Sequence, residues 1–143
     1  MFIDIRSQLG DPGIRELIAL SVFPDEDEPN RTISRYETDG SLRILGYSSE
    51  DEIVGFVGFD IDSENVVTLR HIAVSPDVRG AGFGRGIILE LLHQYEPAAI
   101  VAETDEDTVH FYRNIGFRIE SLGELYPGVE RFRCRYDSQD HDE

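Results

Sequence analysis

Hydrophobic positions recur with two periods along this chain, one close to 3.6 residues and one of two residues. The first period marks an amphipathic helix and the second a strand with one buried face. A helix is predicted to begin at Asp11-Pro12, since an Asp can cap its first turn and Pro is favoured at its first position. Its apolar positions lie at helical spacing: Ile14, Leu17, Ile18 and Val22.

Several segments carry the strand pattern, being rich in Val, Ile and Phe and bounded by turn residues. In the first half of the chain they are Phe2–Arg6, Ser41–Tyr47, Glu52–Ile61 and Val66–Val74. The short polar turn 62–65 joins the last two, so these strands predict an antiparallel meander. The segment Pro24–Ser41 is polar and weakly periodic, and it is interpreted as a long connection with at most a short helical piece.

The second half alternates helices and strands. A helix is predicted at Ile87–Leu92, and another at Glu106–Asn114 with Gly116 as its C-cap. Strands are predicted at Ala98–Ala102, Phe117–Leu122 and Val129–Tyr136. This order indicates one α/β sheet domain over residues 1–136, followed by an acidic tail, 137–143, that is expected to be disordered.

Composition narrows the class of protein. The 143 residues suffice for one domain with a hydrophobic core, and 40% of them are hydrophobic. No apolar run reaches the length of a transmembrane helix, and the N-terminus does not resemble a signal peptide. The single cysteine, Cys134, excludes an internal disulfide and cannot by itself form a zinc site, so neither a disulfide nor a metal is expected. A cytoplasmic protein is the expectation.

The charge balance is strongly acidic, with 29 acidic residues against 13 basic ones. Every basic residue is arginine, because the sequence contains no lysine. A solvated, self-repelling surface explains this balance, and adaptation to a high-salt cytoplasm is the sharper alternative. Either way, the chain offers no basic patch to neutralise phosphates, which argues against a nucleic-acid partner.

The segment Val78–Gly86 places four glycines at alternate positions between a predicted strand and a predicted helix. Glycines let a backbone approach a ligand closely, and the first N–H groups of a helix are unpaired and lie at its positive end. Arg79 and Arg85 add positive charge. The segment therefore predicts a cradle for a pyrophosphate; a loop whose glycines only turn the chain is the alternative.

Two common nucleotide sites are excluded by spacing. A P-loop needs a lysine, which this sequence lacks. A dinucleotide-binding Gly-x-Gly-x-x-Gly would need glycine at position 85 or 87, where the chain has Arg85 and Ile87.

Two segments of the chain resemble the motifs of a known family. Arg79-x-x-Gly82-x-Gly84, preceded by Leu69–Pro76, is similar to the acetyl-CoA signature of the GNAT superfamily of N-acetyltransferases. A second match follows about 30 residues later, where Phe111–Phe117 resembles the family's Phe-Tyr-x-x-x-Gly-Phe segment. The resemblance implies a mixed, mostly antiparallel central sheet flanked by helices and splayed between its middle strands.

The resemblance also implies a set of acetyl-CoA-binding residues. Backbone amides of the glycine-rich segment would hold the pyrophosphate, and backbone groups at the end of the strand Val66–Val74 would pair with the pantetheine arm. An amide near Val74 could face the thioester carbonyl. The implied residues are Ile72, Ala73, Val74, Arg79, Gly80, Ala81, Gly82, Phe83, Gly84, Arg85, Asp105 and Tyr112. Where the family often has Asn, this chain has Asp105, whose other role is to cap the following helix.

Tyr112 is the candidate general acid, because the family uses this tyrosine to protonate the departing thiolate; packing on the helix face is its structural alternative. The protonated amine must also lose a proton before it attacks. His71 and Glu103 are the candidate general bases, and removal through water is a third route.

The predicted function is therefore acetyl transfer from acetyl-CoA to a primary amine, by direct attack in a ternary complex. The predicted partner is a small-molecule or peptide amine, without nucleic acid or membrane, and a homodimer is also considered. A non-catalytic acyl-CoA-binding or regulatory module of the same fold is the alternative, and a nucleotide-binding protein is the third hypothesis.

Overall fold

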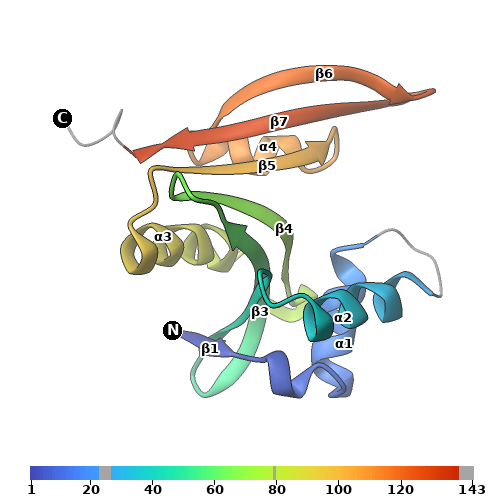
Figure 1. The fold of residues 1–143 in the computed structure, drawn as a ribbon, viewed down its shortest axis with the longest axis vertical. Helices are drawn as coiled ribbons and strands as arrows, with labels where there is room; N and C mark the ends of the chain where they lie inside the picture. The colour runs from blue at the N-terminus through green and yellow to red at the C-terminus, as the bar shows by residue number, and fades with distance from the viewer. Residues whose placement is uncertain (23–26, 79, 139–143) are drawn as a thin grey trace. The chain divides into compact units, whose positions relative to one another are not determined.

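The computed structural model describes residues 1–22, 27–78 and 80–138. They form seven strands in one sheet, in the order β1-β2-β3-β4-β5-β7-β6 (Figure 1). The chain divides into two compact units, one of residues 1–60 and 70–94 and one of residues 61–69 and 95–143. Strand β4 (Val66–Val74) gives its first half to the second unit and its second half to the first.

The first unit contains the predicted meander. Strands β1 (Phe2–Asp4), β2 (Arg43–Ser49) and β3 (Glu52–Ile61) pair antiparallel, with Leu45 opposite Val57 in the centre. Its helical elements are η1 (Arg6–Gln8), α1 (Pro12–Leu20), α2 (Glu28–Thr38), η2 (Pro76–Val78) and α3 (Phe83–Tyr95, as far as Gln94).

The two faces of β3 carry different helices. A side chain built at Gly58 would run into Tyr36 of α2, and one built at Gly55 would meet Ile87 of α3. Positions 55 and 58 point to opposite faces of a strand, because side chains alternate along it. Within this unit the sheet is therefore covered by α2 on one face and by α3 on the other.

Helix α2 corrects the predicted long connection at Pro24–Ser41. The structure has a three-turn helix over Glu28–Thr38, which buries Thr32, Ile33 and Tyr36. Ile33 and Tyr36 join a core cluster with residues of α1 and with Ile44 and Phe56 of the sheet. Helix α2 has few apolar residues, so its stability comes from packing this narrow stripe into the core.

The second unit is built around a three-stranded antiparallel ladder with one parallel strand beside it. Strands β6 (Arg118–Tyr126) and β5 (Ala99–Asp105) both pair with β7 (Val129–Asp137). The start of β4 pairs parallel with β5, from Val66 opposite Ala99 to Thr68 opposite Val101. This parallel pair stands at the predicted splay, and the mixed, mostly antiparallel sheet flanked by helices is confirmed.

The single cysteine and the start of the predicted acidic tail both lie in β7. Cys134 is fully buried, and burial raises the pKa of its thiol, as expected of a core residue and not of a nucleophile. Asp137, predicted to open the acidic tail, ends β7 and pairs with Arg118 and Arg135. The rest of that tail from residue 139 lies outside the described residues, and the predicted single-domain boundary stays a prediction.

Candidate functional site

The glycine-rich segment leads into the first turn of α3. Gly80 and Gly82 have positive φ angles of 89° and 82°, a conformation that favours glycine, and a Cβ at either position would meet nothing within 4 Å. These two glycines therefore serve the backbone path and leave open space beside it. The N–H of Gly86 donates to the carbonyl of Gly82 at 2.9 Å, which begins the hydrogen bonding of the helix.

The start of α3 corrects the predicted helix Ile87–Leu92. The helix begins at Phe83, so Gly84 and Gly86 lie in its first turns and not in a loop. Gly86 has a steric role, because a Cβ there would lie 2.8 Å from the hydroxyl of Tyr47. The backbone N–H groups of Phe83, Gly84 and Arg85 precede the first helical hydrogen bond and are available to a ligand.

Of the two arginines predicted to add positive charge to this segment, the structure describes one, Arg85. Arg85 is exposed at the start of α3, and Ala81 is exposed beside the two turning glycines. Arg79 lies outside the described residues. A helix start with free amides, an exposed arginine and open space over Gly80 and Gly82 fits the phosphate groups of an acyl-CoA.

The end of β4 holds Ile72, Ala73 and Val74, all of them partly buried. On one edge the strand packs against β3, where the N–H of Ser75 donates to the carbonyl of Val54 at 2.8 Å. On the other edge, the parallel pairs with β5 end at Thr68 within the described part of the chain. The backbone after Thr68 is therefore a candidate edge for an added strand-like ligand.

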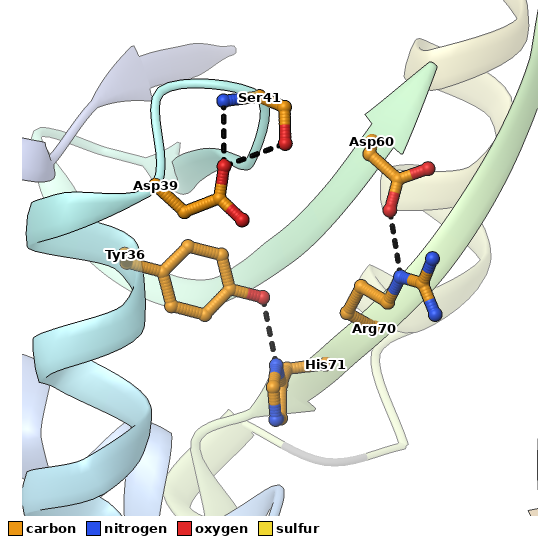
Figure 2. Close-up of polar contacts among 6 residues, drawn as sticks. All are labelled: Tyr36, Asp39, Ser41, Asp60, Arg70 and His71. Atoms are coloured by element: carbon orange, nitrogen blue, oxygen red, sulfur yellow. Dashed lines mark hydrogen bonds and ion pairs between the residues drawn. The ribbon is translucent and has the colours of Figure 1, made fainter. Parts of the chain in front are cut away.

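His71 lies on the same strand and contacts Tyr36 of α2. Nδ1 of His71 is 2.7 Å from the hydroxyl oxygen of Tyr36, and the two rings meet edge to face (Figure 2). Burial, with a smaller effect of Arg35, lowers the pKa of His71 from 6.5 to about 4. The imidazole is therefore neutral at pH 7 and is a weaker base than an exposed histidine.

Tyr112 lies in α4 (Val109–Asn114) of the second unit, with 3% of its surface exposed. Its ring contacts Phe111 and Phe117 edge to face, with centroids 5.0 and 5.2 Å away. Burial raises the pKa of its hydroxyl, so the proton that a general acid must give is present at neutral pH. No hydrogen bond joins this hydroxyl to another described residue.

The end of α4 fixes the position of Tyr112 along the helix. The N–H of Gly116 donates to the carbonyl of Arg113 at 3.2 Å, and that of Phe117 donates to the carbonyl of Tyr112 at 3.1 Å. With a φ of 98° at Gly116, these two bonds form a Schellman motif. Gly116 as the C-cap glycine is thereby confirmed.

The other predicted residues of this unit have ordinary partners. Glu103 is exposed and lies 3.5 Å from Arg133, its neighbour on β7. The carboxylate of Asp105 accepts hydrogen bonds from the N–H groups of Asp107 and Thr108, both at 3.1 Å. Asp105 thus organises the turn that leads into α4, but the predicted capping is wrong, because α4 begins only at Val109 and Thr108 is its N-cap residue.

The predicted site residues therefore fall into two sets. The first unit holds His71, the end of β4 and the start of α3, and the second holds Glu103, Asp105 and Tyr112. Sequence reasoning missed Tyr36, because nothing in a polar segment marks one aromatic side chain as the partner of a histidine 35 residues away.

A groove of about 760 Å³ also lies in the first unit, along η1 and α1 and beside the end of β4. Apolar side chains such as Ile14, Leu17 and Ile53 line it together with Asp11 and Glu16. Such a lining suits a ligand with an apolar body and a positive charge.

Comparison with known proteins identifies the family. A sequence model of the Acetyltransferase (GNAT) family matches residues 12–117, which include both motifs. The chain belongs to the GNAT acetyltransferase family. An uncharacterised N-acetyltransferase from the lysA 3′ region of Bacillus methanolicus is 27% identical over 95 residues, which are 64% of this chain and 78% of that relative.

Solved GNAT structures share the fold. One from Desulfovibrio desulfuricans superimposes with a TM-score of 0.80 at 19% identity, covering 96% of this chain and 98% of the other. A GNAT acetyltransferase from Elizabethkingia anophelis, with acetyl-CoA bound, has a TM-score of 0.67 at 15% identity and covers 96% and 97%. Among the helices described for this chain, none is long and apolar enough to cross a membrane.

Proposed function

We propose that this GNAT protein transfers the acetyl group of acetyl-CoA to a primary amine, by direct attack of the amine while both substrates are bound. The observation that carries the proposal is the start of α3, where free backbone amides follow two glycines with positive φ. This arrangement suits the pyrophosphate of the cofactor. The family match over residues 12–117 supports acetyl transfer as the chemistry.

Acetyl-CoA supplies an activated thioester when it is bound. The amides of Phe83–Arg85 are the proposed donors to its phosphates, and backbone groups of Ile72–Val74 are the proposed partners of its pantetheine arm. In this proposal Asp105 contributes through the turn before α4, since its carboxylate already accepts two backbone hydrogen bonds.

Tyr112 is the proposed general acid. As the amine nitrogen bonds to the acetyl carbon and the carbon–sulfur bond breaks, the sulfur takes up a proton, which the tyrosine hydroxyl can give. The buried, protonated state of Tyr112 and its free hydroxyl support this role. A hydroxyl already held by a protein partner would be a poorer donor.

The acceptor is proposed to be a cationic amine with an apolar portion. The groove along α1 supports this, because Asp11 and Glu16 stand among apolar side chains. The net charge of −16 also favours the approach of a cation, although it does so over the whole surface.

The test combines thiol release and binding. Purified protein is incubated with acetyl-CoA and a panel of polyamines, neutral amines, amino acids and peptides with free N-termini. We expect thiol release to depend on the amine and to be fastest with cationic amines. Binding of acetyl-CoA without release for every amine would instead support a non-catalytic acyl-CoA-binding module, and heat protection by ATP but not by CoA would support a nucleotide-binding protein.

A further inference from the structure

The contact between Tyr36 and His71 joins a fully buried group to a partly exposed one. The Tyr36 side chain is 0% exposed, whereas His71 on β4 is only partly buried. Figure 2 shows the hydroxyl of Tyr36 directed at Nδ1 of His71, at the 2.7 Å that is typical of a hydrogen bond to a hydroxyl. The other ring nitrogen, Nε2, lies on the far side of the imidazole from Tyr36.

Tyr36 has little freedom to turn elsewhere. Its ring lies in the core cluster with Ile33 and Phe56, and its hydroxyl end rests on the bare backbone of Gly58. The position of the hydroxyl is therefore set by packing, and His71 must adapt to it.

The donors and acceptors available to Tyr36 and His71 determine which ring nitrogen of His71 carries the proton. Within the described residues, Nδ1 of His71 is the hydrogen-bond partner found for the Tyr36 hydroxyl. If Nδ1 carried a proton and donated it to the tyrosine oxygen, the O–H of Tyr36 would be left buried without an acceptor. An unmet buried donor is costly, so the favoured arrangement has Tyr36 donating to an unprotonated Nδ1.

Burial, and after it the charges around the pair, keep the imidazole ring of His71 neutral. Arg35 of α2 and Arg70 of β4 both oppose protonation of His71. Glu28 at the start of α2 favours protonation, but its effect is smaller than that of burial or of Arg35. Arg70 itself is paired with Asp60 at 2.7 Å. A neutral imidazole whose Nδ1 accepts a hydrogen bond must carry its proton on Nε2.

We propose that Tyr36 is a positioning residue that holds His71 as the Nε2–H tautomer, so that His71 serves acetyl transfer as a hydrogen-bond donor and not as the base. The part that concerns acetyl transfer rests on the proposed function. An N–H at Nε2 binds a substrate oxygen, such as a carbonyl, but has no lone pair with which to take a proton from the amine. His71 directly precedes Ile72–Val74, the proposed partners of the pantetheine arm.

The tautomer can be read directly. ¹⁵N-labelled full-length protein is examined by long-range ¹H–¹⁵N NMR, which separates protonated from unprotonated ring nitrogens. The sequence has four histidines, so a His71→Gln variant assigns the signal. We expect His71 to show a proton on Nε2 and none on Nδ1, and we expect Tyr36→Phe to mix the two tautomers. A proton on Nδ1 in the wild type would overturn the proposal, and this readout remains if Tyr36→Phe fails to fold.

Kinetics tests the catalytic role. His71→Gln keeps an N–H near the position of Nε2, whereas His71→Leu has none. If His71 is a donor, His71→Leu lowers kcat by about 10²–10³-fold, as for a lost catalytic hydrogen-bond donor, and His71→Gln recovers most of it. If both variants are equally impaired, an N–H donor at this position does not account for the role of His71 and the proposal is wrong. If the wild type releases no thiol with any amine, the proposed function and the donor role fail together, while NMR still decides the tautomer.

Discussion

Gly58 of β3 lies so close beneath Tyr36 of α2 that a Cβ on the glycine would stand 1.8 Å from the tyrosine hydroxyl oxygen. The same built atom would also lie 2.4 and 2.9 Å from two ring carbons. No side chain larger than hydrogen fits there unless Tyr36 moves. Because Tyr36 is also the partner of His71, this packing contact and the state of the imidazole are linked.

Gly58→Ala is expected to destabilise the protein by about 1–3 kcal/mol, the usual cost of overpacking a core. It should also weaken the bond between Tyr36 and His71 and bring a second tautomer of His71 into the NMR spectrum. Denaturant unfolding measures the first effect. Gly40→Ala is the control, because a Cβ at Gly40 meets nothing within 4 Å. Equal stability of the two variants would contradict the packing argument.

The lowered pKa of His71 should make the free energy of unfolding depend on pH. Its pKa is about 4 in the folded chain against 6.5 ordinarily, so between these values the unfolded chain binds the proton more readily. The stabilising contribution is full above pH 6.5, falls as the pH drops and is lost below about 4. The difference in unfolding free energy between wild type and His71→Gln should shrink across that window. A difference that does not change with pH would count against the buried, neutral imidazole.

Tyr112→Phe should lower kcat while leaving the affinity for acetyl-CoA nearly unchanged. The ring stays and only the hydroxyl is lost, and a general acid contributes about 10²–10⁴-fold to the rate. Thiol release and calorimetric binding separate the two effects. Phe111→Leu is the matched control, because it loosens the ring cluster but keeps the hydroxyl of Tyr112. An unchanged kcat in Tyr112→Phe would refute the acid role.

Gly82→Ala should weaken acetyl-CoA binding at the start of α3. Alanine at a φ of 82° costs about 1–2 kcal/mol, so the turn should relax and the amides that follow it should lose their alignment. Calorimetry with acetyl-CoA measures the effect. Gly10→Ala is the comparison, since its Cβ also meets open space but its φ is not in the left-handed region. The cradle assignment fails if Gly82→Ala binds acetyl-CoA as tightly as the wild type.

Added salt should raise the melting temperature. The described ion pairs, such as Arg31–Glu28 and Arg133–Glu103, are exposed and contribute little each, whereas repulsion among 29 acidic residues acts over the whole surface. Raising ionic strength from 0.1 M to 1 M shortens the screening length from about 10 Å to about 3 Å, which weakens the repulsion. Thermal unfolding in KCl up to molar concentration checks this, and a melting temperature indifferent to salt would contradict it.

Much of the fold could be predicted because local pattern and tertiary packing agree. Strands β3 and β4 match their predicted bounds, since strong apolar runs end at clear turn residues. Helix α2 was missed because it presents only Ile33 and Tyr36 as buried hydrophobic side chains over 11 residues. Two buried hydrophobic positions are too few to indicate a helix from the sequence, and their role becomes clear only from the core against which they pack.

In the candidate site, too, the features set by local sequence could be predicted and those set by tertiary contacts could not. The free amides in the first turn of α3 and the end of α4 after Tyr112 depend on neighbours in the sequence, and the positions of the glycines indicate both. The true start of α3 could not be predicted, because glycines at 84 and 86 argue against a helix on propensity alone. The close approach of Gly86 to Tyr47 of β2, which leaves no room for a Cβ, appears only in the folded chain. The partner of His71 depends on a contact between distant segments, which periodicity does not record.

The Schellman motif at Gly116 bears on how the family is recognised. Phe117 and Gly116 close the end of α4 by bonding to the carbonyls of Tyr112 and Arg113, so this part of the signature encodes a way of ending a helix. A relative that has lost catalysis would need the same ending in order to fold, and it would still match the pattern. The signature therefore reflects a shared helix ending as well as chemistry. In the proposed mechanism, acid catalysis depends on one further atom, the hydroxyl oxygen of Tyr112, which the helix ending does not require.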